Sequence, residues 1–204
     1  MQYPTLEDAL AAAVNGDRIT LNQAYDTCNK NIVIDDGRSL TLCLAGQTYT
    51  GTITLGDPDD SSKSGRLTIV NGLETATITG AISCYSNSEL TIQGLEGLAD
   101  ALVINSSLTR DTDSRVNVKG ATFSKGSAWE SYISEGCGST ESGGTFTVAL
   151  YAAGIGDTYY TSLEAALAAA GDGETVKMFR QNENRQLFIT SLRKNNLGGR
   201  GLWL

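Results

Sequence analysis

Two short acidic segments carry the side chains with the most evident capacity for chemistry. Each precedes a run of alternating apolar and polar residues that begins with an arginine, at Arg66 and at Arg115. If these runs stack as parallel strands, the acidic segments meet at one edge, roughly 10 Å apart over two strand spacings, with Tyr85 in the turn between them. The carboxylates of this acidic cluster are Asp57, Asp59, Asp60, Asp111 and Asp113.

Three interpretations of the acidic cluster stay open. Paired carboxylates, with Arg115 beside them, can serve as acid and base in the cleavage of a glycan. The same oxygens can bind calcium, the one cofactor that the sequence suggests, although their spacing is not that of an EF-hand loop. The third interpretation is structural, because Asp is common in solvated turns, where it hydrogen-bonds to the nearby backbone.

Aromatic residues suggest a second kind of site. Trp129 and Tyr132 lie in the longest predicted loop, residues 124–144. Together with Tyr85 they are candidates for stacking on a sugar ring. The alternative is that they hold the loop against the wall of the fold.

Histidine and cysteine usage narrows the chemistry further. The chain has no histidine, which excludes Ser-His-Asp and Cys-His nucleophiles and histidine-ligated zinc. The four cysteines are far apart and form no CxxC pair: Cys28, Cys43, Cys84 and Cys137. We expect isolated thiols, with one or two disulfides of undefined pairing as the alternative.

Charge and hydropathy exclude some partners. The net charge of −8 opposes binding to nucleic-acid phosphates, so we expect no nucleic-acid partner. No stretch approaches the roughly 18 apolar residues of a membrane span, so we expect no membrane insertion. The first residues lack the pattern of a signal peptide, so an exported protein is expected to carry its signal upstream of Met1.

A short repeat indicates how these residues are positioned. Segments with an apolar, small polar, apolar pattern recur every 23 to 30 residues, which is too close for helical crossovers and typical of stacked short strands. The main series is Leu40–Leu42, Leu67–Ile69, Leu90–Ile92, Val116–Val118 and Phe146–Val148, and a second series is Ile53–Leu55, Thr77–Thr79 and Leu102–Ile104. We predict an all-β fold, a parallel β-helix of about five rungs over residues 18–153, with a β-sandwich as the competing architecture.

Outward-facing residues of the main series form two rows in this register. One row is Thr41, Thr68, Thr91, Asn117 and Thr147, and the other is Ser39, Arg66, Glu89, Arg115 and Thr145. A flat hydroxyl row suggests binding to ice or to a crystalline polysaccharide. The adjacent charges interrupt such a plane, so we interpret both rows as ladders that stabilise the sheet.

A longer repeat links the two ends of the chain. Residues 3–21 and 160–178 are identical at nine of 19 positions, and both begin with the spacing of an amphipathic helix. We predict an N-terminal capping helix within residues 1–17, with Thr5 and Asp8 at its start, and a second helix at 162–171, capped by Thr161 and Glu164.

With the second helix a second repeat unit begins, and we assign residues 159–204 to it. This unit is truncated or degenerate, because its end keeps little of the strand pattern. Residues 180–204 contain five basic residues and one acidic residue. They are either natural repeat or the product of a junction or frameshift.

The opening of each long repeat resembles a repeat module of large surface proteins from gut Firmicutes and their relatives. That module opens with Y-x-x-L-x-x-A-L-x-x-A…G-D-x-I-x-L and continues in strands that end L-T-[LI]-x-x-G. The matching residues are Tyr3, Leu6, Ala9, Leu10, Ala13, Gly16, Asp17, Ile19 and Leu21, and the resemblance covers about residues 3–178. It implies a right-handed parallel β-helix of the pectate-lyase-like type.

The same resemblance implies a non-catalytic extracellular module of a bacterial surface protein, used as a stalk or adhesin. Its expected partners are a host or dietary glycan, a surface protein, and neighbouring repeat modules of the same polypeptide. The alternative function is a polysaccharide lyase or glycoside hydrolase that works through the acidic cluster, since one fold hosts both kinds of protein.

Overall fold

The computed structural model describes residues 1–22, 28–72, 74–94, 102–181 and 187–193, with side chains described as far as Met178. The chain forms two compact units. Unit 1 comprises residues 1–135 and 141–149, and unit 2 comprises residues 136–140 and 150–204.

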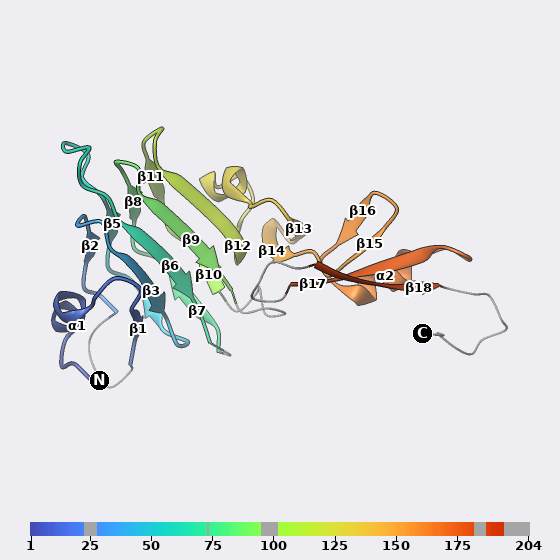
Figure 1. Ribbon diagram of the computed structural model, residues 1–204, viewed down its shortest axis with the longest axis horizontal. Helices are drawn as coiled ribbons and strands as arrows, with labels where there is room; N and C mark the ends of the chain where they lie inside the picture. The colour runs from blue at the N-terminus through green and yellow to red at the C-terminus, as the bar shows by residue number, and fades with distance from the viewer. Residues whose placement is uncertain (23–27, 73, 95–101, 182–186, 194–204) are drawn as a thin grey trace. The chain divides into compact units, whose positions relative to one another are not determined.

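Unit 1 is a parallel β-solenoid with three sheets (Figure 1). The first sheet contains β1 (Arg18–Thr20), β3 (Ser39–Cys43), β6 (Arg66–Val70), β9 (Glu89–Gln93) and the beginning of β12 (Arg115–Ser124). The second contains β2 (Ile32–Ile34), β5 (Ile53–Leu55), β8 (Ile82–Cys84) and β11 (Leu108–Arg110). The third contains β4 (Thr48–Tyr49), β7 (Ala76–Ile78), β10 (Leu102–Ile104) and the end of β12. The predicted fold class is confirmed.

The number of turns differs from the prediction of about five rungs. Among the described residues, three turns contribute a strand to every sheet: β3–β4–β5, β6–β7–β8 and β9–β10–β11. The segment Phe146–Val148, predicted as a fifth rung, lies in β14 (Thr145–Leu150), which runs antiparallel to β12. β13 (Cys137–Ser142) pairs with β14. The series therefore ends where β12 passes from the first sheet into the third.

The predicted second series combines strands from two different sheets. Ile53–Leu55 forms β5 of the second sheet, whereas the segments near residues 77 and 103 form β7 and β10 of the third. Both sheets use the same alternation of buried and half-buried residues. Their sequences look alike because both bury one face in the same core.

The two outward rows are confirmed over their first four members. Thr41, Thr68, Thr91 and Asn117 are in register, and so are Ser39, Arg66, Glu89 and Arg115. The Glu89 carboxylate lies 3.9 Å from the Arg66 guanidinium and accepts a hydrogen bond of 3.0 Å from the Asn117 amide. The predicted fifth members, Thr147 and Thr145, do not continue the rows. They lie in β14, where they pair with Thr122 and Ser124 of the antiparallel β12.

The core lies inside the three sheets and consists mainly of branched aliphatic side chains. Fully buried members include Ile34, Leu44, Ile53, Leu55, Ile69, Ile78, Leu90, Ile92, Leu102 and Val118. Tyr49 is also fully buried, and its hydroxyl donates a 2.5 Å hydrogen bond to the Lys30 carbonyl. Burying each such aliphatic side chain stabilises the fold by about 1.5–3 kcal/mol.

Glycines make the sharp corner between the third and second sheets. Gly51 and Gly80 occupy this corner in successive turns, and both are buried. A Cβ on Gly80 would overlap the carbonyl oxygen of Gly51, and one on Gly51 would overlap that of Lys30. At these two positions there is no room for a Cβ, because the backbone of one turn rests directly on the backbone of the next.

The N-terminal helix α1 (Leu6–Ala12) lies at the end of unit 1 beside β1 and β2 (Figure 1). Its predicted cap is confirmed, because the Thr5 hydroxyl accepts a 3.0 Å hydrogen bond from the Asp8 amide. At the other end, the Arg38 guanidinium donates to the carbonyls of Leu10 and Ala13 at 2.8 and 2.7 Å. Arg38 thereby satisfies carbonyls that the helix leaves without partners.

Unit 2 contains an antiparallel sheet and the second helix. The sheet has the order β16 (Thr158–Tyr160), β15 (Ala153–Ile155), β17 (Thr175–Gln181) and β18 (Leu187–Arg193), and α2 (Leu163–Ala169) packs on it. The predicted cap at Thr161 is wrong by one residue, since the Ser162 hydroxyl accepts from the Ala165 amide at 3.1 Å. Most of residues 180–204, whose origin the sequence left open, lie outside the described residues or in β18.

Replacing Gly80 tests the stacked corner. We expect Gly80→Ala to lower the free energy of unfolding by about 2–3 kcal/mol, because the new methyl group overlaps the Gly51 carbonyl. The matched control is Gly72→Ala, where an added Cβ meets nothing within 4 Å. Chemical denaturation of both variants measures the difference, and equal stability would contradict the stacking argument.

Candidate functional site

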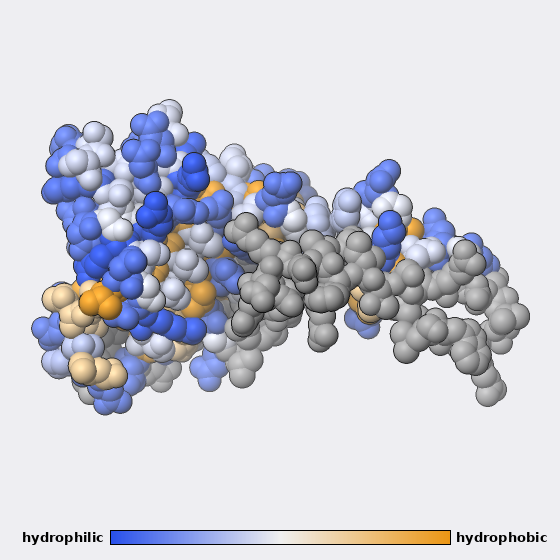
Figure 2. Space-filling view, in the orientation of Figure 1, coloured by the Kyte–Doolittle hydropathy of each residue, from blue (hydrophilic) through white to orange (hydrophobic). Residues whose placement is uncertain are grey.

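The acidic cluster lies at the corner where chain segments pass from the second sheet to the first. Its segments follow β5 and β11, and Tyr85 follows β8, the strand that lies between them. Ser86 links the segments directly. Its amide donates to the Asp111 carboxylate at 2.6 Å, and its hydroxyl donates to the Asp57 carbonyl at 2.5 Å. Figure 2 shows mainly hydrophilic residues over these turns, at the top of the view.

Asp111 is the most fully hydrogen-bonded carboxylate of this corner. One oxygen accepts the Ser114 amide at 2.9 Å and the Ser114 hydroxyl at 2.5 Å, while the other accepts the Ser86 amide. Burial acts to raise the pKa of Asp111, but these hydrogen bonds lower it by more, so its pKa lies below the ordinary value of 3.8. Asp111 is therefore an ionised acceptor that joins two turns.

Asp57 and Asp60 organise their own turn. The Asp57 carboxylate accepts the Asp59 amide at 3.0 Å and pairs with the Lys63 ammonium at 3.2 Å. Lys63 also lies 3.3 Å from a carboxylate oxygen of Asp35 in the preceding turn. The Asp59 amide and then Lys63 lower the pKa of Asp57. Lys63 thus links the carboxylates of Asp57 and Asp35, which belong to neighbouring turns.

The Asp60 carboxylate accepts the hydroxyl and the amide of Ser62 at 2.6 and 3.0 Å. These two hydrogen bonds lower the pKa of Asp60 below its ordinary value. The interaction is a local turn of the Asx type. It extends the ionised form of the carboxylate to lower pH.

The other members of the predicted site point to no common centre. Asp59 and Asp113 are exposed, and Asp113 accepts a 3.3 Å hydrogen bond from the neighbouring Thr112 hydroxyl. Arg115 is exposed in the outward row, in register with Glu89. Over the described residues, no three or more His, Cys, Asp or Glu side chains are grouped to hold a metal ion. Calcium binding stays a prediction from the sequence.

The candidate aromatic residues divide into one buried and two half-buried side chains. Trp129, in a short 3₁₀ helix (Ala128–Tyr132), is 1% exposed, and its indole nitrogen donates to the Ser106 carbonyl at 2.9 Å. With no face open to a sugar ring, Trp129 has the structural role, which is to hold the loop against the solenoid wall. Tyr85 is half-buried in its turn.

Tyr132 forms a pair with Arg110 that the sequence does not reveal. The Arg110 guanidinium lies 5.3 Å from the centre of the Tyr132 ring and donates to its hydroxyl at 3.1 Å. Arg110 also donates to the Ser114 carbonyl. This cation–π contact attaches the loop to the acidic corner.

Three serines of this corner were missed by reasoning from the sequence. Ser86, Ser88 and Ser114 are buried, and the Ser88 hydroxyl accepts the Gly65 amide at 2.9 Å. Ser88 and Ser114 each stand immediately before a strand of the first sheet. That shared position is the signal by which Ser88 and Ser114 could have been found, and Ser86 lacks it.

All four cysteines are thiols in the structure. Cys43, Cys84 and Cys137 are buried and Cys28 is half-buried, and the expectation of thiols rather than disulfides is confirmed. Burial raises the pKa of Cys84 to about 11, so this thiol is protonated at neutral pH and a poor nucleophile.

No helix within the described ranges has the length and apolar character needed to cross a membrane.

Substituting Asp111 tests the role of the corner network. We expect Asp111→Asn to lower the free energy of unfolding by about 1 kcal/mol at neutral pH, because an amide cannot accept all three hydrogen bonds and the half-exposed site is partly screened. Asp113→Asn is the matched control, with an expected change within about 0.5 kcal/mol.

The same pair of variants has a defined pH dependence. The lowered pKa of Asp111 means that its stabilising effect is complete above the ordinary pKa and is lost as the pH falls through the lowered one. The stability difference between the wild-type chain and Asp111→Asn is therefore expected to shrink below about pH 4. A difference that stays constant from pH 7 to pH 3 would contradict this account.

No protein family, no curated protein and no solved structure matches the chain.

Proposed function

We propose that the chain is a non-catalytic module of an extracellular bacterial surface protein, acting as a stalk or adhesive segment. The proposal rests on the resemblance of its opening motif to such modules, whose solenoid is right-handed and pectate-lyase-like. The observation that supports its non-catalytic part is the hydrogen-bonding of Asp111, whose carboxylate joins two turns of the solenoid.

The directions of the pKa shifts favour a structural role for the acidic cluster over catalysis. A general acid that cleaves a glycosidic bond needs a carboxyl group whose pKa is raised toward neutrality. The pKa values of Asp57, Asp60 and Asp111 are all lowered, by hydrogen bonds and by Lys63. Ionised carboxylates with these partners stabilise turns, and this argues against these three residues as the general acid of a glycoside hydrolase.

The first sheet provides the surface that suits an adhesive role. Its outward rows present hydroxyl, amide and charged side chains at the spacing of strands in a sheet. Such rows can hydrogen-bond to the hydroxyls of a glycan or to polar groups of a protein. Their partner is proposed as a host or dietary glycan or a surface protein.

A panel of neutral and acidic polysaccharides, with and without calcium, tests this function. We expect no release of reducing ends or unsaturated products from any member. Two exposed residues of the cluster supply fold-neutral variants, Asp59→Asn and Asp113→Asn. Turnover that either variant abolishes, with an unchanged melting temperature, would overturn the proposal in favour of an enzyme.

Glycan contact is tested separately by binding measurements on the same panel. We expect Thr68→Lys to lower the affinity for a bound glycan by at least about tenfold, because it places a bulky charge in the centre of the hydroxyl row. Thr109→Lys, on the exposed strand β11 of the second sheet, is the control with the same change of charge. Equal loss in both variants would contradict a role for the first sheet.

A further inference from the structure

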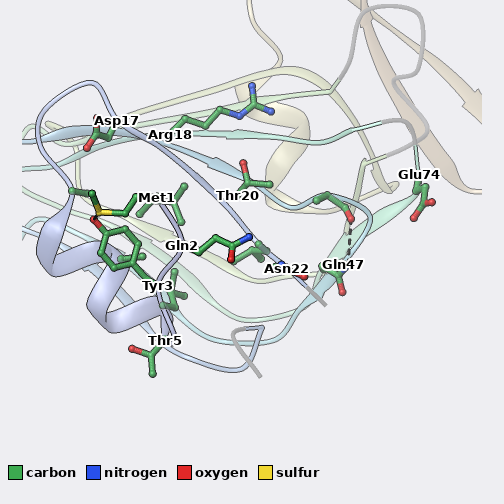
Figure 3. Close-up of a pocket in the computed structure, with 16 residues that line it drawn as sticks. Met1, Gln2, Tyr3, Thr5, Asp17, Arg18, Thr20, Asn22, Gln47 and Glu74 are labelled. Atoms are coloured by element: carbon green, nitrogen blue, oxygen red, sulfur yellow. Dashed lines mark hydrogen bonds between the residues drawn. The ribbon is translucent and has the colours of Figure 1, made fainter. Parts of the chain in front are cut away.

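An open cavity lies at the N-terminal end of unit 1. It measures about 700 Å³ and lies between α1, the segment Met1–Tyr3 and β1 (Figure 3). Its apolar lining comes from Leu6, Ala9, Ala13, Ile19 and Leu21. Leu6 and Leu21 are themselves buried, so the apolar surface that stays partly open to this space comes from Ala9, Ala13 and Ile19. Polar residues complete the lining, among them Gln2, Asp17, Thr20, Gln47 and Glu74.

One edge of β1 is open toward the same end. On one side β1 pairs with β3, where the Leu21 amide donates to the Cys43 carbonyl and the Asp17 carbonyl accepts from Thr41, both at 2.9 Å. Because backbone groups alternate along a strand, those of Arg18 and Thr20 face the other side. No strand of the described residues pairs with β1 on that side. Such an edge is a template for strand addition.

Unit 2 contains the same helix–turn–strand motif, 157 residues later in the chain. The helices are capped by Thr5 and by Ser162 at equivalent positions. The turns that follow are also alike. The Val14 amide donates to Asp17 at 2.8 Å in one, and the Gly171 amide donates to Glu174 at 2.7 Å in the other. The two motifs are therefore copies in structure as well as in sequence.

In unit 2 the equivalent edge is occupied. β15 pairs antiparallel with β17, with Ala153 opposite Met178, Gly154 opposite Lys177 and Ile155 opposite Val176. These three residues of β17 correspond to Leu21, Thr20 and Ile19 of β1. β16, which corresponds to Met1–Tyr3, lies on the other side of β15. The cavity of unit 1 therefore occupies the position that β15 fills in unit 2.

Burial at three equivalent positions of the two motifs follows this difference, whereas Leu6 and Leu21 are already buried in unit 1. Ala166, Ala170 and Val176 are 0%, 4% and 0% exposed in unit 2, where β15 contributes Ala153 to the same cluster. Their counterparts in unit 1, Ala9, Ala13 and Ile19, are only half-buried. What unit 1 lacks is one strand with small and branched side chains.

We propose that the N-terminal cavity is a docking slot for one β-strand, supplied by a β-hairpin of the β15–β16 kind from another repeat unit. The strand adds antiparallel to the open edge of β1 at residues 19–21, with small and branched residues facing α1 in the pattern of Ala153 and Ile155. Main-chain hydrogen bonds supply affinity, and the apolar lining selects the side chains. The inference concerns assembly of units and does not depend on the proposed surface function.

A labelled synthetic peptide with the sequence of residues 152–160 tests the slot against the full chain. We expect saturable binding by fluorescence anisotropy, with amide chemical-shift changes concentrated at residues 18–21. Changes concentrated at residues 176–178 would show that the peptide displaces the chain's own hairpin, and would overturn the proposal. Absence of saturation up to about 1 mM, the weak end of specific binding, would also overturn it.

Two substitutions make the test specific. Thr20→Pro removes an amide that faces away from β3, a change that edge strands tolerate, and is expected to weaken peptide binding at least tenfold. Thr20→Ala keeps the amide and is expected to bind within about twofold of the wild-type chain. A Thr20→Pro chain that binds as well as the Thr20→Ala chain would contradict strand addition.

A second peptide provides a control that does not depend on whether the Thr20→Pro chain folds. In this peptide Asp replaces the residue that corresponds to Ile155, so the protein itself is unchanged. We expect at least a tenfold loss of affinity, because the charged side chain would enter the apolar lining. Equal affinity of the two peptides would overturn the proposed mode of docking.

Discussion

The whole of unit 1 depends on one constraint, which is that successive turns of backbone lie at the spacing of hydrogen-bonded strands. In the strands, regular backbone hydrogen bonds maintain this spacing, but the corners must maintain it without such a ladder of bonds. The structure solves the problem in two ways. Glycines at 51 and 80 let one backbone rest on the next. At the acidic corner, side chains supply hydrogen bonds between turns, as the hydroxyls of Ser86 and Ser88 do. Buried amides that would otherwise lack partners are thereby satisfied.

This constraint also explains the chemistry of the acidic corner. A carboxylate that accepts backbone amides from its own turn and from the turn below is held in its charged form. Asp111 has this role, and Asp57 reaches the preceding turn through Lys63 and Asp35. Groups that are needed to hold turns together are poorly suited to change their protonation state during a reaction. The corner is thus best understood as part of the scaffold.

Much of the fold was predictable because alternation of small polar and branched residues defines strands and their inward face. Leu40, Leu67 and Leu90 stack as the pattern indicated. The pattern does not say which sheet a strand joins, because all three sheets bury the same kinds of side chain, and so β5 was grouped with β7. It also does not reveal direction, which is why β14 was predicted to run parallel to its neighbours.

The candidate site was predictable in position but not in role. Register alone brings the Asp57 and Asp111 turns to one corner. The hydrogen bonds that define their role come from buried serines, whose importance is visible only when successive turns are superimposed. For Trp129, the residue type is equally compatible with stacking on a sugar and with packing under a loop, and only its burial decides.

The outward row of Ser39, Arg66, Glu89 and Arg115 has a consequence for how the chain reaches its native order of turns. A solenoid with similar turns can misfold by omitting one of them, since the strands of the first sheet share one pattern and can pair with one another in the wrong order. If the turn that contains Glu89 were looped out, Arg66 would lie beside Arg115 at the spacing of paired strands, and two like charges would repel. The alternation of charge therefore distinguishes the correct succession of turns from one in which the Glu89 turn has been skipped.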